Sequence, residues 1–242
     1  MKRFISCSIL IATFIHGFSQ IDSLPHVQAG VPSFVKDSLD NYVTRALGDW
    51  EIPGVAVCVI KDGKVAVMKG YGVKDYDTKD KVDENTLFMI GSNSKAFTAT
   101  ALAMLDAEKP PAGKLSLDDK VVKWIPEFKL DNKAAGEQAI IRDLLCHRIG
   151  FRTFQGDFTY WTSNLTRRDV IEKMSHIKAT YPFRTTWGYT NAAFLTAGEI
   201  IPKATGMQWE DFVKAKIFDP LDMKNTLALS KDFPHAPNKS LP

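Results

Sequence analysis

Two apolar runs separated by a turn signal predict a β-hairpin in the first third of the chain. The runs are GVAVCVIK at 54–61 and KVAVMKGYG at 64–72, and Asp62-Gly63 lies between them. An Asp-Gly pair flanked by β-rich runs is a strong hairpin signal. Both runs are apolar at nearly every position, which is typical of strands covered on both faces. Because an isolated hairpin is only marginally stable in water, we expect further partner strands.

Apolar residues with a helical period predict one helix before the hairpin and several after it. The segment 33–47 has the pattern of an amphipathic helix, with Ser33 available as its N-cap. The polar stretch YDTKDKVDEN at 76–85 is expected to be a loop, and a long helix should follow from residue 92 to Pro110-Pro111. The other expected helices are two short ones around WIPEF within 117–148, one at 166–177 that Thr166 can cap, one at 190–203 that Gly206 can follow, and one at 208–217.

This order of elements indicates an α+β fold with segregated parts, because strands and helices do not alternate. We expect residues 20–75 to form the N-terminal helix and hairpin, and residues 76–242 to form a mainly helical subdomain. No clear strand follows residue 73. The partner strands that the hairpin needs are therefore missing, and we expect the chain to lack its C-terminal part.

The first residues have the pattern of a secretory signal peptide. Lys2-Arg3 precede the apolar run FISCSILIATFI at 4–15, and small residues at 17 and 19 follow it. A buried strand is the alternative interpretation. A run of this length cannot span a bilayer as a helix, so no stable membrane span is expected. We predict cleavage after Ser19 and an exported protein, either periplasmic or secreted.

Composition and charge are typical of a globular protein. The chain has 45% hydrophobic and 24% charged residues, which excludes the disordered and collagen-like classes. The formal net charge of +3 includes Lys2 and Arg3, so the mature chain would carry +1, which argues against nucleic-acid binding. Cys7 would leave with the signal peptide. Cys58 and Cys146 lie in apolar runs, so we expect buried free thiols, with one disulfide as the alternative.

Sequence motifs for metal and cofactor sites are absent. The five His form no His-Glu-x-x-His, and no Cys-x-x-Cys, dinucleotide loop or phosphate loop occurs. Asp75, Asp77 and Asp80 lack the glycine of a calcium loop, so a solvated acidic loop is expected. We therefore expect no metal and no cofactor. No Gly-x-Ser-x-Gly elbow occurs either, which argues against an α/β-hydrolase.

A Ser-x-x-Lys spacing places both side chains on one face of a helix, where the amine can take the hydroxyl proton. Three pairs have it, namely Ser33-Lys36, Ser92-Lys95 and Ser175-Lys178. Ser92 starts a long apolar helix directly after the apolar run LFMIG. A buried helix start favours a neutral lysine and offers backbone N–H groups to a developing anion. The alternative interpretation is a plain N-cap serine beside a surface lysine.

A second element, WGYTNAAF at 187–194, places Tyr189 and Asn191 just before a predicted helix. A Tyr hydroxyl beside a cationic Lys can be partly ionised and can shuttle a proton. An Asn side-chain amide can hold a substrate carbonyl. Alone, this pattern more often means a core Tyr and a capping Asn.

Four sequence blocks occur in a fixed order: LFMIGSNSKAFTATALAML, LLCHRIGF, WGYTNAAFLTAGEII and IFDPLDMKNT. Together they resemble the serine beta-lactamase and penicillin-binding-protein superfamily. The nearest branch is that of class C beta-lactamases, D-Ala-D-Ala carboxypeptidases and related esterases. The resemblance covers roughly residues 32–228. It implies a beta-lactamase/transpeptidase-like fold, with an antiparallel sheet flanked by helices, incomplete here, and a helical subdomain.

The resemblance also implies roles for the candidate residues. Ser92 would be the acyl-accepting nucleophile, Lys95 and Tyr189 would jointly move protons, and Asn191 would position substrate. The N–H of Ser92 would give half of an oxyanion hole. His147 and Gly150 are interpreted as structural. The expected protein is an exported serine hydrolase that acts through an acyl-enzyme on beta-lactams, D-Ala peptides or small esters.

The chain departs from the family pattern at the third motif, Lys/His-Ser/Thr-Gly. No such triplet occurs, since Lys203-Ala-Thr205-Gly206 has an extra residue. In the family that motif lies on a sheet strand that also supplies an oxyanion donor. Two alternatives to an active hydrolase therefore stay open: a protein that recognises penicillin or peptides without turnover, and an inactive fragment.

Overall fold

The computed structural model describes residues 30–108, 115–157 and 160–241. The predicted signal peptide and Pro110-Pro111 lie outside the described residues. The chain divides into two compact units. The first, called the hairpin unit, holds the described residues up to Thr86 together with Leu241. The second, called the helical unit, is Leu87–Ser240.

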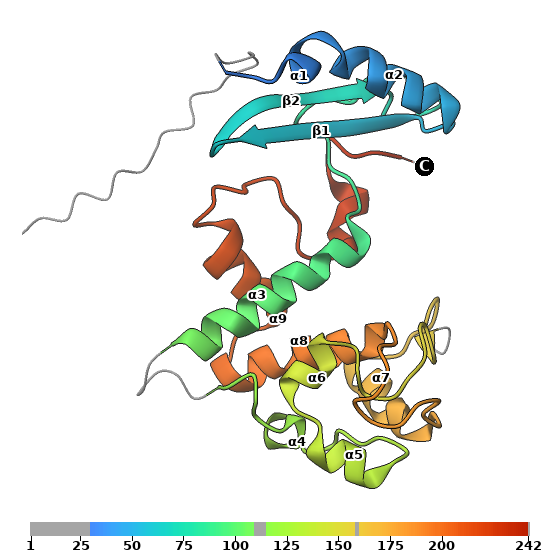
Figure 1. The fold of residues 1–242 in the computed structure, drawn as a ribbon, viewed down its shortest axis with the longest axis vertical. Coiled ribbons are helices and arrows are strands. Elements are labelled where there is room, and N and C mark those ends of the chain that lie inside the picture. The colour runs from blue at the N-terminus through green and yellow to red at the C-terminus, as the bar shows by residue number, and fades with distance from the viewer. Residues whose placement is uncertain (1–29, 109–114, 158–159, 242) are drawn as a thin grey trace, which may run out of the picture. The chain divides into compact units, whose positions relative to one another are not determined.

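The hairpin unit contains two helices and the predicted hairpin (Figure 1). The elements are α1 (Ser33–Asp37), α2 (Leu39–Asp49), β1 (Gly54–Lys61) and β2 (Lys64–Gly72). The strands pair antiparallel, as the Asp-Gly turn predicted. The predicted helix 33–47 is wrong in one respect, because Ser38 has a φ of −129° and separates α1 from α2. Ser33 is the first residue of α1, and Pro32 occupies the N-cap position.

Helix α2 covers one face of the hairpin. Leu39 and Val43 of α2 form a small core with Tyr71, and valines of both strands pack against it. Asp40 of α2 accepts hydrogen bonds of 2.7 Å from the Tyr71 hydroxyl and from Lys69 Nζ. Apolar contact and polar contact therefore fix the same strand against α2.

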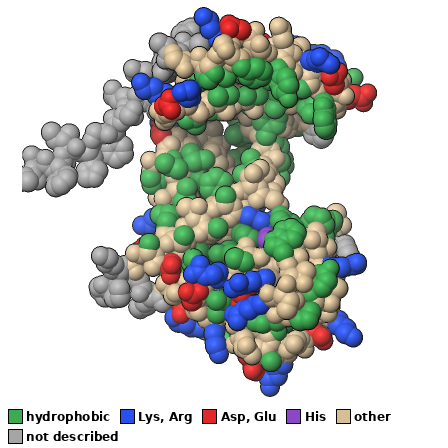
Figure 2. Space-filling model, viewed as in Figure 1, with side chains coloured by type: hydrophobic (Ala, Val, Ile, Leu, Met, Phe, Trp, Pro, Cys, Tyr) green, Lys and Arg blue, Asp and Glu red, His purple; other side chains and the backbone are tan. Residues whose placement is uncertain are grey.

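The opposite face of the hairpin is exposed, although both strands are apolar at nearly every position. Ile60 is 66% exposed and Met68 is 46% exposed, and Cys58 stands directly opposite Met68 in the pairing. Hydrophobic side chains are visible on the surface of this unit in Figure 2. The sheet has two strands within the described residues. The exposed Cys58 also corrects the expectation of a buried thiol.

The hairpin unit extends past residue 75, where the sequence had suggested a boundary. Val73 bridges Lys81, and the Val82 N–H donates to the Gly72 carbonyl. Val82 is buried. The loop therefore folds back on the hairpin, and the helical unit begins at Leu87.

No helix within the described ranges is long and apolar enough to cross a membrane.

The helical unit is built around α8 (Asn191–Thr205), which packs against α3, α4, α6, α7 and α9. Those elements are α3 (Ser94–Ala107), α4 (Val121–Trp124), α6 (Ile141–Leu145), α7 (Arg167–Lys173) and α9 (Trp209–Val213). Short turns complete the unit, namely η1 (Gly91–Asn93), η3 (Met174–His176), η4 (Lys214–Phe218) and η5 (Ser230–His235), together with α5 (Lys133–Gln138). One apolar core joins them, with Leu102, Ile141 and Ile200 fully buried.

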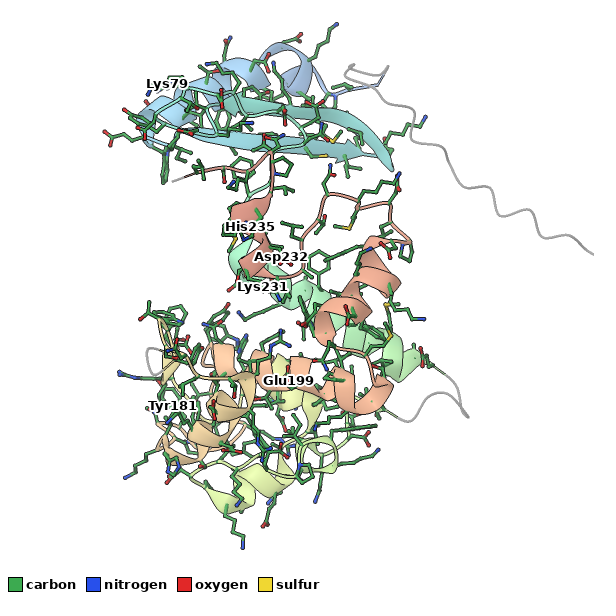
Figure 3. All side chains as sticks on the ribbon, turned by 180° about the vertical axis from the view of Figure 1, so that it is seen from behind. Lys79, Tyr181, Glu199, Lys231, Asp232 and His235 are labelled. Carbon is green, nitrogen blue, oxygen red and sulfur yellow. The ribbon has the colours of Figure 1, made fainter. Side chains whose placement is uncertain are left out.

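Polar contacts also tie these helices together. Arg167 of α7 binds Glu199 of α8 at 3.0 Å and Glu210 of α9 at 3.2 Å. Figure 3 labels Glu199 on α8, and it labels Lys231, Asp232 and His235 on η5. The residues after η5 run beside Leu87, whose N–H donates to the Asn238 carbonyl. The segment before α3 is therefore held in place by residues near the far end of the unit.

Most predicted helices are present with shifted ends, and one prediction is wrong. Three short helices, not two, lie within 117–148. Asn132 accepts a hydrogen bond from the Ala135 N–H and starts α5, while Asp143 accepts from the Ile140 N–H and starts α6. Each cap satisfies N–H groups that have no partner inside the helix, so each begins a separate helix. The predicted caps Thr166 of α7 and Gly206 of α8 are both confirmed.

Gly206→Ala is expected to destabilise the helical unit by about 1 kcal/mol. Gly206 ends α8 with a φ of +77°, and an added Cβ would meet no atom within 4 Å, so the whole cost is left-handed backbone strain. Urea unfolding measures the loss. Gly48→Ala is the control, because Gly48 lies within α2, has open space and no positive φ. It should leave stability unchanged or raise it. Equal losses at both positions would contradict the argument.

Candidate active site

Ser92 and Lys95 come from the segment that leads into α3. Gly91 has a φ of +52° and turns the chain into η1. The helix predicted to start at Ser92 instead starts at Ser94, because Gly91–Asn93 forms a 3₁₀ turn. Such turns are common at helix N-termini. Ser92 is exposed and Lys95 is half-buried, so the start of the helix is not enclosed as expected.

Tyr189 and Asn191 lie on either side of the start of α8, and the loop after α6 fixes them. The Gly188 N–H donates to the His147 carbonyl at 2.9 Å, and the Phe154 N–H donates to the Tyr189 carbonyl at 2.8 Å. The backbones approach so closely that a Cβ on Gly188 would lie 1.8 Å from the Phe151 carbonyl oxygen. A glycine is therefore required directly before Tyr189.

The four predicted side chains meet in the helical unit. Lys95 Nζ lies 3.0 Å from Ser92 Oγ and 2.6 Å from Asn191 Oδ1. The Tyr189 hydroxyl lies 2.5 Å from Ser92 Oγ, although 97 positions separate the two residues. The predicted proximity of Ser92, Lys95 and Tyr189 is thus confirmed, and Ser92 Oγ lies between the lysine and the tyrosine.

Lys95 contributes the positive charge of the cluster. Its Nζ lies 4.6 Å from the centroid of the Tyr189 ring, and no carboxylate among the described residues lies within ion-pair distance of it. Burial by itself would raise the pKa of the Tyr189 phenol. Polar contacts with Lys95 and Ser92 and the charge of Lys95 outweigh burial, so this pKa lies below its ordinary value. The phenol is therefore easier to ionise than a free tyrosine.

His147 forms one wall of the cluster, which the sequence did not reveal. Its ring lies 4.6 Å from the Tyr189 ring, and its Nδ1 accepts a 3.0 Å hydrogen bond from the Thr190 N–H. Burial, and then the nearby charge of Lys95, lower its pKa to about 4. His147 is therefore neutral at pH 7, with its proton on Nε2 because Nδ1 accepts.

Asp157 and Tyr160 were also missed by the sequence analysis. Asp157 is fully buried, and its carboxylate accepts hydrogen bonds of 2.5 Å from Asn191 Nδ2 and 2.8 Å from the Tyr160 hydroxyl. No motif marks Asp157, since it lies in a loop with no periodic pattern. Only the fold brings it to Asn191.

Asp143 anchors the loop that precedes Tyr189. This fully buried carboxylate binds Arg148 at 2.6 Å and Arg184 at 2.7 Å. Burial acts to raise its pKa, but hydrogen bonds from Arg184, the Ile140 N–H and Arg148 outweigh burial and lower the pKa. Arg184 thereby joins the loop before Tyr189 to the start of α6.

The other two Ser-x-x-Lys pairs lie outside the cluster. Ser33 and Lys36 are both exposed on α1. Ser175 is half-buried, donates its hydroxyl to the Glu172 carbonyl at 2.7 Å, and is followed by an exposed Lys178.

Cys146, expected to be buried, is exposed and free. Over the described part of the chain, no three His, Cys, Asp or Glu side chains are grouped as metal ligands would be.

Comparisons with known proteins agree on one family. The family model described as Beta-lactamase matches residues 39–242. The chain is 33% identical to Unguisins hydrolase ungD of Aspergillus violaceofuscus over 193 residues. This match covers 78% of this chain and 34% of that protein. It is 29% identical over 192 residues to Protein flp of Staphylococcus aureus strain MW2, covering 79% of this chain and 38% of that protein.

A solved structure is similar over most of the chain. It is the octameric penicillin-binding protein homologue from Pyrococcus abyssi, with a TM-score of 0.70, 26% identity, and coverage of 87% of this chain and 48% of that one. The chain thus spans between a third and a half of the length of these relatives. The helices and small antiparallel sheet agree with the α+β fold expected from sequence. The chain belongs to the Beta-lactamase family, which consists in general of serine hydrolases.

Proposed function

We propose that the cluster around Ser92 is the nucleophilic centre of an exported serine hydrolase that works through an acyl-enzyme. One observation carries the proposal: Ser92 Oγ lies 3.0 Å from Lys95 Nζ and 2.5 Å from the Tyr189 hydroxyl. A serine hydroxyl is a weak nucleophile unless an adjacent group takes its proton. Both neighbours lie within the distance needed for that transfer.

In the proposed reaction, Ser92 Oγ attacks the acyl carbon of the substrate while its proton passes to the pair formed by Tyr189 and Lys95, which both contact Ser92 Oγ. The charge that develops on the substrate oxygen would be stabilised in part by the N–H of Ser92 at the start of η1. The proton is then delivered to the leaving group, and the acyl group stays on Ser92. Water attacks this ester with the same proton carriers, which releases the acid and restores Ser92.

Asn191 is proposed to position substrate, and the structure limits how it can do so. Its Oδ1 contacts Lys95, and one of its two N–H groups contacts Asp157. Its second N–H makes no hydrogen bond within the described residues. That N–H is the donor we assign to a substrate carbonyl.

The proposed substrates are beta-lactams, D-Ala peptides and small esters. The family, the similarity to a penicillin-binding protein homologue and a relative named as a hydrolase support this choice. A protein that recognises penicillin or peptides without turnover is the second candidate, since the same cluster can accept an acyl group that is never released.

Trapping the acyl-enzyme tests the proposal. The complete gene product is incubated with benzylpenicillin, a D-Ala-D-Ala peptide or p-nitrophenyl acetate, quenched in acid and analysed by peptide mass spectrometry. We expect an acyl adduct on the peptide that contains Ser92, together with multiple turnovers of at least one substrate. A stoichiometric adduct without turnover would select the second candidate. Adducts on other residues only, or none with any of the three, would refute both.

A further inference from the structure

Asp157 is a buried carboxylate next to the proposed active site. Its carboxylate contacts two neutral donors, Asn191 Nδ2 and the Tyr160 hydroxyl. No cation among the described residues lies within 4 Å of it in an ion pair. Burial of an acidic group without a cationic partner is unfavourable. A carboxylate at position 157 therefore needs hydrogen-bond donors around it, whereas a neutral residue of the same shape would not restrict its neighbours to donors.

This need fixes the orientation of Asn191, because Asp157, Asn191 and Lys95 form a row of hydrogen-bonding groups. An ionised carboxylate only accepts hydrogen bonds, and an ammonium group only donates them. Asn191 lies between the two, so its amide has one allowed orientation, with Nδ2 toward Asp157 and Oδ1 toward Lys95. The two distances, 2.5 Å and 2.6 Å, agree with this orientation. A neutral amide at 157 could donate or accept, and Asn191 could then turn over.

Resting on the proposed function, we propose that Asp157 is a positioning residue that orients the Asn191 amide so that its oxygen holds Lys95 against Ser92. Lys95 would otherwise lose the acceptor that fixes Nζ on the side facing Ser92 Oγ. The same orientation directs the second N–H of Asn191 to the substrate. Asp157 thus acts on two parts of the site through one side chain and touches neither the nucleophile nor the substrate.

The charge of Asp157 adds a second effect that can be measured. The ionisable groups that face this region are Lys95 from α3, His147 from the loop after α6, Tyr160 from the loop of Asp157 itself, and Tyr189 before α8. The negative charge of Asp157 acts to raise the pKa of Tyr189, against the larger effects of Lys95 and Ser92. Removal of that charge should therefore lower the pKa of Tyr189.

The test compares Asp157 variants of the complete gene product in two backgrounds, with p-nitrophenyl acetate as substrate. Asp157→Ala is expected to lower kcat/KM about tenfold to a hundredfold when Asn191 is present, because small misplacements of catalytic groups have effects of this size. In the Asn191→Ala background the same change should cost less than about twofold. Effects that pass through one residue vanish when that residue is removed. Tyr160→Phe removes the other contact of the carboxylate and is the matched control, with a loss below about threefold.

The pH profile gives a second readout that a merely structural role would not move. With Asp157→Asn, which keeps the shape, the rise of kcat/KM with pH that ionisation of Tyr189 produces should shift to lower pH. Should Asp157→Ala not fold, Asp157→Asn carries the comparison in both backgrounds. Equal losses with and without Asn191, or no loss with Asn191 present, would overturn the inference. A wild-type protein without Ser92-dependent turnover would overturn the proposed function first, so the two failures are distinguishable.

Discussion

Ser92→Ala is expected to lower the turnover of an activated ester by at least about 10⁴. In acyl-transfer enzymes, removal of the nucleophile alone can cost on the order of 10⁶ in kcat. Here the loss should be of that kind, because Lys95 and Tyr189 both contact Ser92 Oγ. The measurement is the steady-state release of p-nitrophenol by the complete gene product, beside the variant, over a range of substrate concentrations.

The chain supplies matched controls with the same Ser-x-x-Lys spacing. Ser33→Ala and Ser175→Ala each remove a hydroxyl three residues before a lysine, and among the described residues neither serine shares a hydrogen bond with Tyr189 or Asn191. We expect both to retain turnover within about twofold of the wild-type protein. Comparable losses in all three variants would mean that the loss in Ser92→Ala does not come from its place in the cluster. Full activity in Ser92→Ala would require a different nucleophile.

The elements that follow from local chemistry could be predicted from the sequence. The hairpin ends at the predicted residues because Asp62-Gly63 leaves no other turn, and Asp62 itself has a positive φ. Thr166 and Gly206 mark a helix start and a helix end through their own side-chain or backbone preferences. Ser92 and Lys95 could be paired because three positions on a helical turn bring side chains together.

The parts that depend on long-range contact could not be predicted. Nothing local to Asp157 or His147 indicates that one binds Asn191 and the other packs on Tyr189, since both contacts form only when the loop after α6 meets the start of α8. The break at Ser38 also escaped prediction, because the apolar period continues through it. Cys58 has apolar neighbours in sequence but lies on the exposed face of the hairpin. An apolar run predicts a strand, but it does not predict which side chains of that strand other residues will cover.

All described contacts of the candidate site lie within the helical unit. Ser92 and Lys95 come from η1 and α3, Asp157 comes from a loop, and Tyr189 and Asn191 come from the start of α8. Contacts between elements support the segment before α8: the Phe154 N–H donates to the Tyr189 carbonyl, and Arg184 binds Asp143 of α6. The stability of this unit and the geometry of the site are therefore linked, and a change that loosens the loop after α6 should affect both.

The helical unit is expected to lose about 3 kcal/mol of stability between pH 6.5 and pH 4 through His147 alone. The folded protein holds the pKa of His147 at about 4, chiefly by burial and then by the charge of Lys95, while an unfolded histidine titrates near 6.5. Between these values the unfolded chain binds the proton more readily, so stability rises with pH. The contribution is complete above pH 6.5, falls as the pH drops toward 4, and changes no further below it.

His147→Asn isolates this contribution. An asparagine accepts the left-handed backbone at this position, where φ is +55°, and its oxygen can accept from the Thr190 N–H as Nδ1 does, but it does not titrate. Urea unfolding of the complete gene product at pH 7 and at pH 4.5 should show a smaller loss of stability in this variant than in the wild-type protein, by about 2 to 3 kcal/mol. The variant will be weaker at pH 7 because the ring contact with Tyr189 is gone, so the comparison uses the difference between the two pH values. His176→Asn, at an exposed histidine of the same unit, should keep the wild-type difference. An unchanged difference in His147→Asn would mean that His147 is not held neutral by its surroundings.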